Sequence, residues 1–390
     1  MSRRRWFTVF LAFPLVVLFL VGSSFGQKYG VVFEGANWTG LTSSDTQTLS
    51  NRMVETGVKW VLLSNLWFYS EPYAPTIGCS PSQGPHCYCG PRAGCHNYNF
   101  TALDQLVNNL NAAGVQVGLR FFLPPTWASG APCQGFSSDP NTSLCGEILS
   151  NHMSSFKDNL YDLAYNMATR YRGKVAFWAI WNEPNLRYSF SPQDVNAGSG
   201  YLTNEYMVLI QFPAHDGITA VIPGAFFVGP DLFTPNGGGQ VRTCDAFGHC
   251  MYLLGQGNWE DSMLRFFSNN FQTFTIHNYS DTDAGSRTAI GNTWSIMVSL
   301  GKQRQIWLDE FNFRNPCSYS EQTIVNYTRS LYTQMTNERA FYFSITDGFG
   351  AGSATCGSGT TNFGLLQAQA YNWAPKPVLY PGFQSIVSGH

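Results

Sequence analysis

Two short apolar stretches of this chain each run directly into a carboxylate. Residues 176–185 read Ala-Phe-Trp-Ala-Ile-Trp-Asn-Glu-Pro-Asn, and residues 304–313 read Arg-Gln-Ile-Trp-Leu-Asp-Glu-Phe-Asn-Phe. Short apolar runs of this kind are typical of strands that are buried on both faces. Pro184 cannot continue a hydrogen-bonded ladder, and it disfavours the α conformation at Glu183. Each stretch therefore predicts a buried parallel strand, with Glu183 or Glu310 at its carboxyl end.

The spacing of these two glutamates constrains the architecture further. They are 127 residues apart. A parallel strand and the helix that follows it occupy roughly 30–45 residues, so the spacing equals about three strand–helix units. If Glu183 ends the fourth strand of a barrel, Glu310 ends the seventh. Both carboxylates would then lie at the end of the barrel where barrel enzymes hold their reacting groups.

The rest of the chain supports eight such units. The predicted strands are Tyr29–Glu34, Val58–Ser64, Val115–Phe121, Val175–Trp181, Ala220–Val228, Thr273–His277, Gln305–Asp309 and Ala340–Ile345. The predicted helices are Asp45–Thr56, Thr101–Ala113, Phe156–Tyr171, Leu202–Phe212, Glu260–Asn269, Thr293–Leu300, Glu321–Met335 and Lys376–Val387. This alternation predicts an α/β protein with a single (β/α)8 barrel. An open, doubly wound sheet is the alternative, but no glycine-rich phosphate turn follows the first strand.

The N-terminus has the pattern of a secretory signal peptide. Three arginines at residues 3–5 precede the apolar run Trp6–Gly22, and small residues lie just before Gln27. We therefore expect a signal peptide over residues 1–26 and one barrel domain over residues 27–390. An uncleaved membrane anchor is the alternative, because the apolar run is long for a signal peptide. The formal net charge of −2 gives no basic footprint for nucleic acid.

The cysteines and sequons also favour a secreted protein. The chain has ten cysteines, and each falls between a predicted strand and the next predicted helix. Disulfides would order these long loops at the open end of the barrel. Expected pairs are Cys133–Cys145, Cys244–Cys250 and Cys317–Cys356, with Cys79, Cys87, Cys89 and Cys95 paired locally. A metal site at Cys87 and Cys89 is the alternative. Candidate N-glycosylation sites are Asn37, Asn99, Asn141, Asn278 and Asn326.

Three motifs together resemble clan A of the glycoside hydrolases. They are Trp181–Asn185 at the fourth predicted strand, His277-Asn278-Tyr279 at the sixth and Glu310 at the seventh. Members of this clan are retaining (β/α)8 enzymes. The resemblance implies a secreted glycosidase that cleaves β-glycosidic bonds by double displacement, without a cofactor or metal. Glu183 would be the general acid/base and Glu310 the nucleophile.

The resemblance also implies substrate contacts around the two glutamates. Asn182 would bind the sugar 2-hydroxyl, and Tyr279 would donate to Glu310 and keep it ionised. His277 belongs with Tyr279 in this interpretation, although a histidine in such a strand could also be a packed core residue. Arg120, near the end of the third strand, would brace Glu310 or bind a sugar acid, or else form a salt bridge within the barrel mouth.

Two further residues are expected near the substrate. Glu34, at the end of the first strand, would hold a sugar hydroxyl. Trp127, like Trp38 and Trp67, would stack on a sugar ring, with packing within the loops as the alternative. The partner of the mature chain would be a carbohydrate, and we expect a monomer that binds neither nucleic acid nor membrane.

The family within the clan is less well defined. Trp181–Asn185 and the loop Pro125–Trp127 are similar to family 39, and the Lys-Pro-x-x-Tyr ending at Lys376 is found across the clan. Clan members usually have a Trp after the eighth strand as a sugar platform, which is missing here, so Phe349 or Asp347 would replace it. The alternative function is an inactive carbohydrate-binding or cell-wall protein on the same barrel. An inactive copy would be expected to lose one carboxylate, and both are present.

Overall fold

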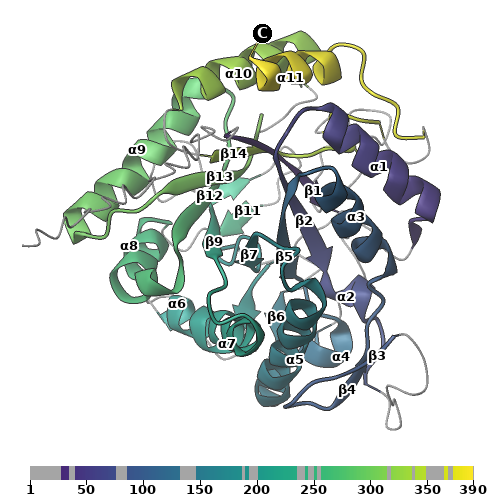
Figure 1. Cartoon of the computed structure of the whole chain (residues 1–390). Coiled ribbons are helices and arrows are strands. Elements are labelled where there is room, and N and C mark those ends of the chain that lie inside the picture. The colour runs from purple at the N-terminus through teal and green to yellow at the C-terminus, as the bar shows by residue number, and fades with distance from the viewer. Residues whose placement is uncertain are drawn as a thin grey trace, which may run out of the picture.

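The protein forms a closed barrel of eight parallel strands (Figure 1). The computed structural model describes residues 28–34, 40–75, 86–131, 146–186, 189–192, 201–234, 242–244, 250–252, 256–313, 318–335, 339–347, 364–367 and 372–389. The barrel strands, in order, are β1 (Tyr29–Glu34), β2 (Trp60–Leu66), β5 (Gln116–Phe122), β7 (Phe177–Ile180), β9 (Phe227–Phe233), β12 (Thr273–Tyr279), β13 (Ile306–Asn312) and β14 (Arg339–Tyr342). Since β14 pairs with β1, the predicted (β/α)8 barrel is confirmed.

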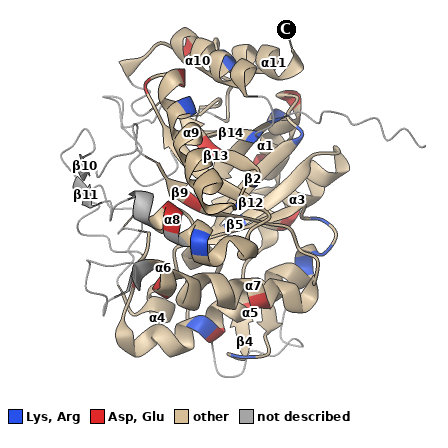
Figure 2. Ribbon diagram, turned by 90° about the vertical axis from the view of Figure 1, so that its left-hand side faces the viewer, with Lys and Arg blue, Asp and Glu red and all other residues tan. Residues whose placement is uncertain are grey.

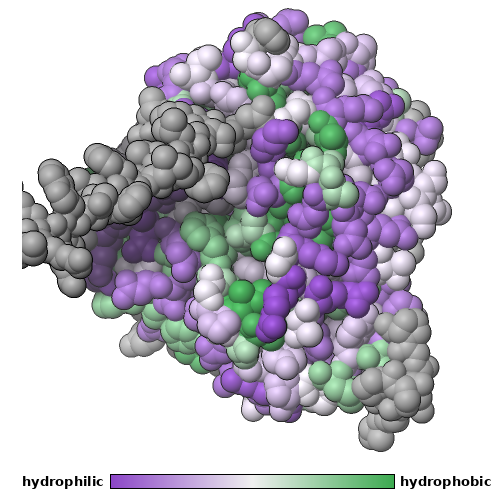
Figure 3. All heavy atoms as spheres, in the orientation of Figure 1, coloured by the Kyte–Doolittle hydropathy of each residue, from purple (hydrophilic) through white to green (hydrophobic). Residues whose placement is uncertain are grey.

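Helices surround this barrel. The longer ones are α1 (Ser43–Glu55), α3 (Thr101–Ala112), α5 (Met153–Tyr171), α7 (Phe212–Val221), α8 (Gln256–Phe267), α9 (Asp283–Leu300), α10 (Glu321–Gln334) and α11 (Leu379–Ser388). The short ones are α2 (Trp67–Ser70), α4 (Thr126–Ser129), α6 (Tyr201–Tyr206), η3 (Ser150–His152), η4 (Met207–Gln211) and η5 (Ser268–Asn270). The outer surface seen in Figure 3 is mostly hydrophilic, as expected for helices whose apolar side faces the barrel. Figure 2 shows basic and acidic residues interspersed among these helices.

The fifth predicted strand, Ala220–Val228, was misplaced and shares only Phe227 and Val228 with β9. Ala220 and Val221 belong to α7, and the strand begins only at Phe227. The helical segment is also longer than predicted, because α6, η4 and α7 continue one another from Tyr201 to Val221 and α7 packs against α5. An apolar, β-branched run does not distinguish a buried helix end from a strand. The other predicted strands overlap the observed ones.

Aromatic rings fill one end of the barrel interior. Trp60, Phe177, Trp307 and Phe341 lie with ring centroids 5.4–6.3 Å apart. Gly118 makes room for this cluster, because a Cβ atom there would lie 2.1 Å from the ring of Phe177. The barrel is therefore a packed core at this end, covered by the Arg339 guanidinium, which lies 3.6 Å from the Trp60 ring centroid.

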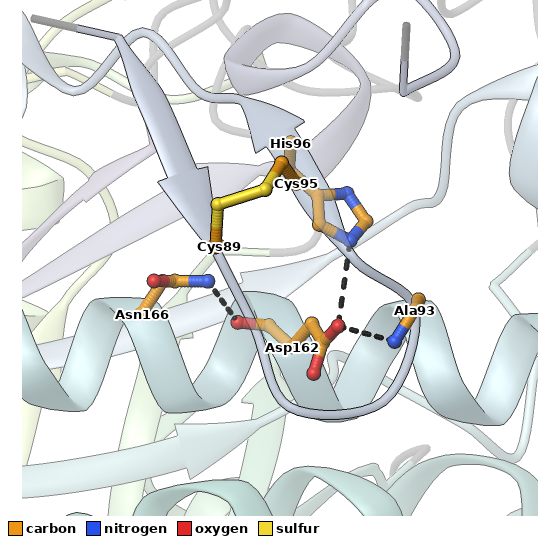
Figure 4. The surroundings of a disulfide bond; sticks show 6 residues. All are labelled: Cys89, Ala93, Cys95, His96, Asp162 and Asn166. Carbon is orange, nitrogen blue, oxygen red and sulfur yellow. Dashed lines mark hydrogen bonds and ion pairs between the residues drawn. A yellow bond between two sulfur atoms is a disulfide. The ribbon is translucent and has the colours of Figure 1, made fainter. Parts of the chain in front are cut away.

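Three short strand pairs lie in the loops. They are β3 (Cys87–Cys89) with β4 (Cys95–Asn97), β6 (Glu147–Ile148) with β8 (Ser191–Pro192), and β10 (Arg242–Cys244) with β11 (Cys250–Tyr252). Cys89 and Cys95 form a disulfide across the first pair (Figure 4), and Cys87 is disulfide-bonded as well. Since these sulfurs are bonded, they are not free thiolate ligands, and the alternative of a metal site is wrong.

The other predicted disulfides are tested only partly. Cys244 and Cys250 are opposite each other in the register of β10 and β11, as their predicted pairing requires. Cys79, Cys133, Cys145, Cys317 and Cys356 lie outside the described residues. No cysteine occurs in any of the eight barrel strands.

The sequon at Asn278 is not a site for glycosylation of the folded protein. Asn278 is fully buried on β12, and its side-chain amide donates to the carbonyl and hydroxyl oxygens of Thr234. By contrast, Asn326 on α10 is exposed. The predicted signal peptide lies outside the described residues; within them, no helix has both the length and the apolar character needed to cross a membrane.

Candidate active site

Glu183 is held at the end of β7 by an unusual backbone conformation. Trp181 and Glu183 have positive φ angles of 72° and 44°. The Glu183 N–H donates to the carbonyl of Asp231 at 3.0 Å, and the Asn185 side chain exchanges two hydrogen bonds with the backbone of Phe233. Left-handed conformations are strained for such residues and persist only where neighbours fix them. The Asn-Glu-Pro-Asn turn is therefore fixed to β9, and the Glu183 carboxyl is 6% exposed.

Glu310 lies on β13 and is held by two donors. The Tyr279 hydroxyl donates to Glu310 Oε2 at 2.6 Å, and Arg120 Nη1 donates to Oε1. Glu310 is 3% exposed. The sequence predicted both partners, and the structure places them on the neighbouring strand β12 and across the barrel on β5.

His277 connects the two glutamates. Its Nδ1 atom lies 3.0 Å from Glu183 Oε1 and 3.4 Å from Glu310 Oε2. One carboxylate oxygen of each glutamate and a ring nitrogen of His277 all lie within 4.8 Å of one another. His277 is fully buried, but its ring faces the carboxylates, so it is part of the site and not a packed core histidine. The two carboxyl groups are therefore close together at the predicted end of the barrel.

Arg120 organises the layer below the glutamates. Its Nε donates to Asp231 at 2.9 Å and its Nη2 to Asp309 at 2.7 Å, in addition to the bond to Glu310. The side chain is fully buried and surrounded by protein carboxylates. These contacts are the salt bridges within the barrel mouth that were one alternative, and the one to Glu310 agrees with a role as its brace.

The charges in this region do not balance unless some carboxyl groups are protonated. The five acids Glu34, Glu183, Asp231, Asp309 and Glu310 surround only two cations, Arg120 and His277. Burial and the nearby Glu310 raise the pKa of Glu34 to about 8. Burial and the charge of Asp309 raise the pKa of Asp231 well above its usual range. Glu34 is thus mostly neutral near pH 7, and the neutral form of Asp231 is favoured, as expected for acids buried among like charges.

Histidine 277 carries one of the two positive charges. Burial lowers the pKa of His277, but Glu310 and Asp309 outweigh burial and hold the pKa well above its usual range. Arg120 Nη2 lies 3.1 Å from His277 Nε2. The same His277 nitrogen lies 3.5 Å from Asp309 Oδ2.

Asn182 and Phe343 complete the wall of the site. Asn182 Oδ1 is buried and lacks a hydrogen-bond partner among the described residues, so a ligand hydroxyl could use it. The Phe343 ring meets the Tyr279 ring edge to face, with centroids 5.9 Å apart. Phe343 directly follows β14 and belongs to a buried cluster with Phe177, Trp307 and Phe341.

Asp347 does not replace the missing Trp. Its carboxylate accepts from Lys376 Nζ and from the Gly364 N–H, both at 2.8 Å, and it is 4% exposed. The other candidate, Phe349, lies outside the described residues. The Lys-Pro-x-x-Tyr ending is structural, since Lys376 fixes the segment after β14 and the Tyr380 hydroxyl donates to the Arg52 carbonyl of α1.

Trp127 lies in a layer of loop packing. Its Nε1 donates to the Glu71 carbonyl at 3.0 Å, and its ring meets Trp67 edge to face at 6.0 Å. Trp67 itself is fully buried and cannot stack on a sugar. Trp127 is half-buried, so only one part of its ring is open to a ligand, and Trp38 lies outside the described residues.

Sequence reasoning missed Asp231, Asp309 and Phe343. Asp309 directly precedes Glu310, and two adjacent acids at the end of an apolar strand were a signal for it. Asp231 was hidden by the wrong boundary of the fifth strand, because it follows Gly229-Pro230 beyond the predicted end at Val228. Phe343 was hidden because an aromatic residue within an apolar strand looks like core.

Comparison with known proteins shows similarity in structure only. No protein-family model and no curated protein sequence matches the chain. A family 39 glycoside hydrolase from Bacteroides cellulosilyticus WH2 is similar in structure, with a TM-score of 0.56, 17% identity and 93% of this chain covered. This chain spans 64% of that protein's length, which is less than two thirds.

Two other glycoside hydrolases are similar over more of their own length. GH5_18 from Streptomyces cattleya has a TM-score of 0.59, 12% identity and coverage of 93% of this chain and 80% of that one. Xylanase 10B from Thermotoga maritima has a TM-score of 0.51, 13% identity and coverage of 93% and 94%. At these identities the likeness establishes the fold alone: the chain has a (β/α)8 barrel, as these glycoside hydrolases do.

Proposed function

We propose that this protein is a retaining glycoside hydrolase that cleaves β-glycosidic bonds of oligo- or polysaccharides. The observation that carries the proposal is the closeness of Glu183 and Glu310, whose nearest carboxylate oxygens lie within 4.8 Å. Retaining glycosidases hold their carboxyl groups about 5–5.5 Å apart, whereas inverting enzymes need about 6.5–9.5 Å to admit a water molecule. The observed spacing therefore supports double displacement.

The surroundings of each glutamate suit different tasks. Glu310 accepts hydrogen bonds from Tyr279 and Arg120, and such donors stabilise an ionised carboxylate, which is the form a nucleophile needs. Glu183, at the end of β7, would protonate the leaving oxygen in the first step. It would then remove a proton from water when the glycosyl–enzyme ester is hydrolysed.

The sugar contacts follow from the same geometry. The unpaired Oδ1 of Asn182 would accept a hydrogen bond from the sugar 2-hydroxyl, a contact that strengthens in the transition state. Glu34, neutral near pH 7, could both donate to and accept from another hydroxyl. The ring of Phe343 would take the position of the sugar platform, since sugar C–H faces pack on aromatic rings.

The proposal also covers the context of the protein. The apolar N-terminal run and the disulfide between Cys89 and Cys95 support secretion into an oxidising compartment. The mature enzyme would act as a monomer on a carbohydrate, with residues 27–390 as its catalytic domain.

The test replaces each glutamate by glutamine and measures turnover of a dinitrophenyl glycoside, with and without azide. Glu183→Gln should form the glycosyl–enzyme, because a good leaving group needs no proton, and should then stall. Azide should release the sugar as a β-glycosyl azide and restore turnover. Glu310→Gln should lose about 10³-fold or more in kcat for every substrate, because the first step needs the nucleophile.

Two results would contradict the proposal. If azide rescues Glu310→Gln to a β-glycosyl azide and Glu183→Gln stays inactive, the two roles are reversed. If the wild-type protein binds β-glucan, mannan or xylan but cleaves none of them and no aryl β-glycoside, the protein is an inactive binding protein on this barrel.

A further inference from the structure

Asp231 forms hydrogen bonds with the backbone of Glu183 and with Arg120, which in turn holds Glu310. It lies on β9, is fully buried and has a φ angle of 56°. Its carbonyl accepts from the Glu183 N–H at 3.0 Å. Its carboxyl Oδ2 accepts from Arg120 Nε at 2.9 Å, and Arg120 donates in turn to Glu310. Asp231 therefore contacts both the backbone of Glu183, the acid/base, and Arg120, which braces the nucleophile Glu310.

The position of Asp231 is fixed by neighbours on β12. Its N–H donates to Thr275 Oγ1 at 2.8 Å, and the Thr275 hydroxyl donates back to its carboxyl. Two residues earlier, Gly229 has a φ of 150°, and a Cβ atom there would lie 2.7 Å from the Phe271 ring. The Thr275 hydroxyl and Arg120 Nε therefore hold the Asp231 carboxyl from two sides.

Asp231 and Asp309 lie side by side. Both carboxyl groups are fully buried and accept from Arg120, and one oxygen of each lies within 4.8 Å of the other and of a His277 ring nitrogen. Two carboxylates this close and away from water repel each other when both are ionised, which favours a proton on one of them.

The directions of the two pKa shifts favour Asp231 as the protonated member of the pair. Burial raises the pKa of Asp309, but His277 and Arg120 outweigh burial and hold that pKa below its usual range. Burial and the adjacent Asp309 charge raise the pKa of Asp231. Asp309 is therefore the anion that both cations approach, while the neutral Asp231 leaves the charge of Arg120 directed to Asp309 and Glu310.

We propose that Asp231 is a positioning residue for both glutamates and that it acts as a neutral acid beside the Asp309 carboxylate. An ionised Asp231 would compete with Glu310 for Arg120 and would place one more negative charge beneath the site. The kinetic part of this proposal rests on the proposed glycosidase function. The proposed protonation of Asp231 is independent of that function, and it can be measured even if the protein has no glycosidase activity.

The kinetic test compares three variants on an aryl β-glycoside. Asp231→Asn keeps an acceptor for Arg120 and a donor for Asp309, so kcat should stay within about 3-fold of wild type. Asp231→Ala removes both and should lower kcat by about 100-fold, with KM within about 3-fold because Asp231 is buried beneath the site. Asp309→Asn removes the anion between the two cations and should also lower kcat by about 100-fold.

The matched control is Glu260→Gln, which neutralises a buried acid on α8 that accepts from Thr293 and lies outside the barrel. Its kcat should equal that of wild type.

Full activity in Asp231→Ala would refute the positioning role of Asp231. An equal loss of activity in Asp231→Asn and Asp231→Ala would refute the proposal that Asp231 is a neutral acid. If Asp231→Ala does not fold, as judged by circular dichroism, the comparison of Asp231→Asn with Asp309→Asn shows which of the two acids carries the negative charge. Tolerance of Asp309→Asn but not of Asp231→Asn would place the charge on Asp231.

An infrared measurement separates this inference from the proposed function. The spectrum of wild type minus that of Asp231→Asn at pH 7 should contain the C=O stretch of a protonated carboxyl group. Only carboxylate bands in this difference would overturn the proposal, whether or not the enzyme is active. A wild-type protein that cleaves no glycoside but shows the carboxyl band would refute the proposed function and leave the protonation of Asp231 intact.

Discussion

Glu34 changes its charge in a pH range in which an enzyme works. Burial, followed by the charge of Glu310, raises its pKa from 4.5 to about 8. Because the folded-state pKa is the higher one, the stabilising contribution of the neutral carboxyl is fully present below pH 4.5 and is lost as the pH rises through 8. The same titration would replace the proposed donor to the sugar by an anion next to Glu310. In that case a single side chain would couple stability and substrate binding to pH.

We predict that Glu34→Gln removes this pH dependence. For wild type, KM should rise and the free energy of unfolding should fall between pH 6 and pH 9, whereas both should stay nearly constant in the amide variant. The measurements are kcat/KM profiles and urea unfolding at the two pH values. Glu55→Gln, which changes an exposed glutamate on α1 paired with Arg52, is the control. An unchanged alkaline limb in Glu34→Gln would show that another group titrates there.

At the scale of elements, the hairpin β3–β4 is attached to the barrel by a buried imidazolium. His96 Nδ1 lies 2.7 Å from Glu71 Oε1, and its Nε2 lies 3.6 Å from Asp162 Oδ2 on α5 (Figure 4). Asp162 also accepts from the Arg92 and Ala93 N–H groups. Since Trp127 donates to the Glu71 carbonyl, the loops after β2 and β5 and the helix α5 are joined at this point.

The charge of His96 makes this attachment pH-dependent. Burial lowers its pKa, but the Asp162 and Glu71 carboxylates outweigh burial and raise the pKa to about 9. The contribution to stability is therefore fully present below pH 6.5 and is lost as the pH rises through 9.

We predict that the hairpin loosens at alkaline pH before the barrel does. Amide exchange of β3 and β4, corrected for the intrinsic rate, should accelerate about 10-fold or more between pH 7 and pH 10, while β12 and β13 stay protected. His96→Gln should have the fast hairpin exchange already at pH 7, because a buried carboxylate pair then lacks its cation. Equal protection of the hairpin in wild type and His96→Gln at pH 7 would contradict this.

At the scale of the whole molecule, stability depends on the aromatic end of the barrel. Phe177 is packed among Trp60, Trp307 and Phe341, so its ring cannot move away from a new atom. Gly118 is the residue that this ring approaches. A close-packed interior of this kind accommodates added volume only by strain.

We predict opposite effects for two glycine-to-alanine substitutions. Gly118→Ala should lower the free energy of unfolding by about 1–3 kcal/mol, because the new methyl group overlaps the Phe177 ring. Gly291→Ala on α9, where a Cβ would meet nothing within 4 Å, should raise it by about 0.5–1 kcal/mol. Urea unfolding of both variants measures the difference. A higher free energy of unfolding in Gly118→Ala would show that the barrel interior can accommodate the added methyl group.

The sequence by itself determined the barrel and the two glutamates. Apolar strands that end abruptly in Glu183 and Glu310 are local patterns, and parallel strands of one barrel bring their carboxyl ends together wherever the loops go. The positions of His277, Tyr279 and Arg120 followed from the same rule, because each lies at or near a strand end.

The tertiary structure decided which neighbours these residues have. The burial of Trp67, the binding of Arg120 by three carboxylates and the contact of Asp231 with Asp309 depend on side chains from strands far apart in the chain. Asp231 and Arg120 are separated by 111 residues, and Arg120 and Glu310 by 190. Protonation depends on burial and on the summed charge of such neighbours, so the neutral states of Glu34 and Asp231 arise only when the barrel closes.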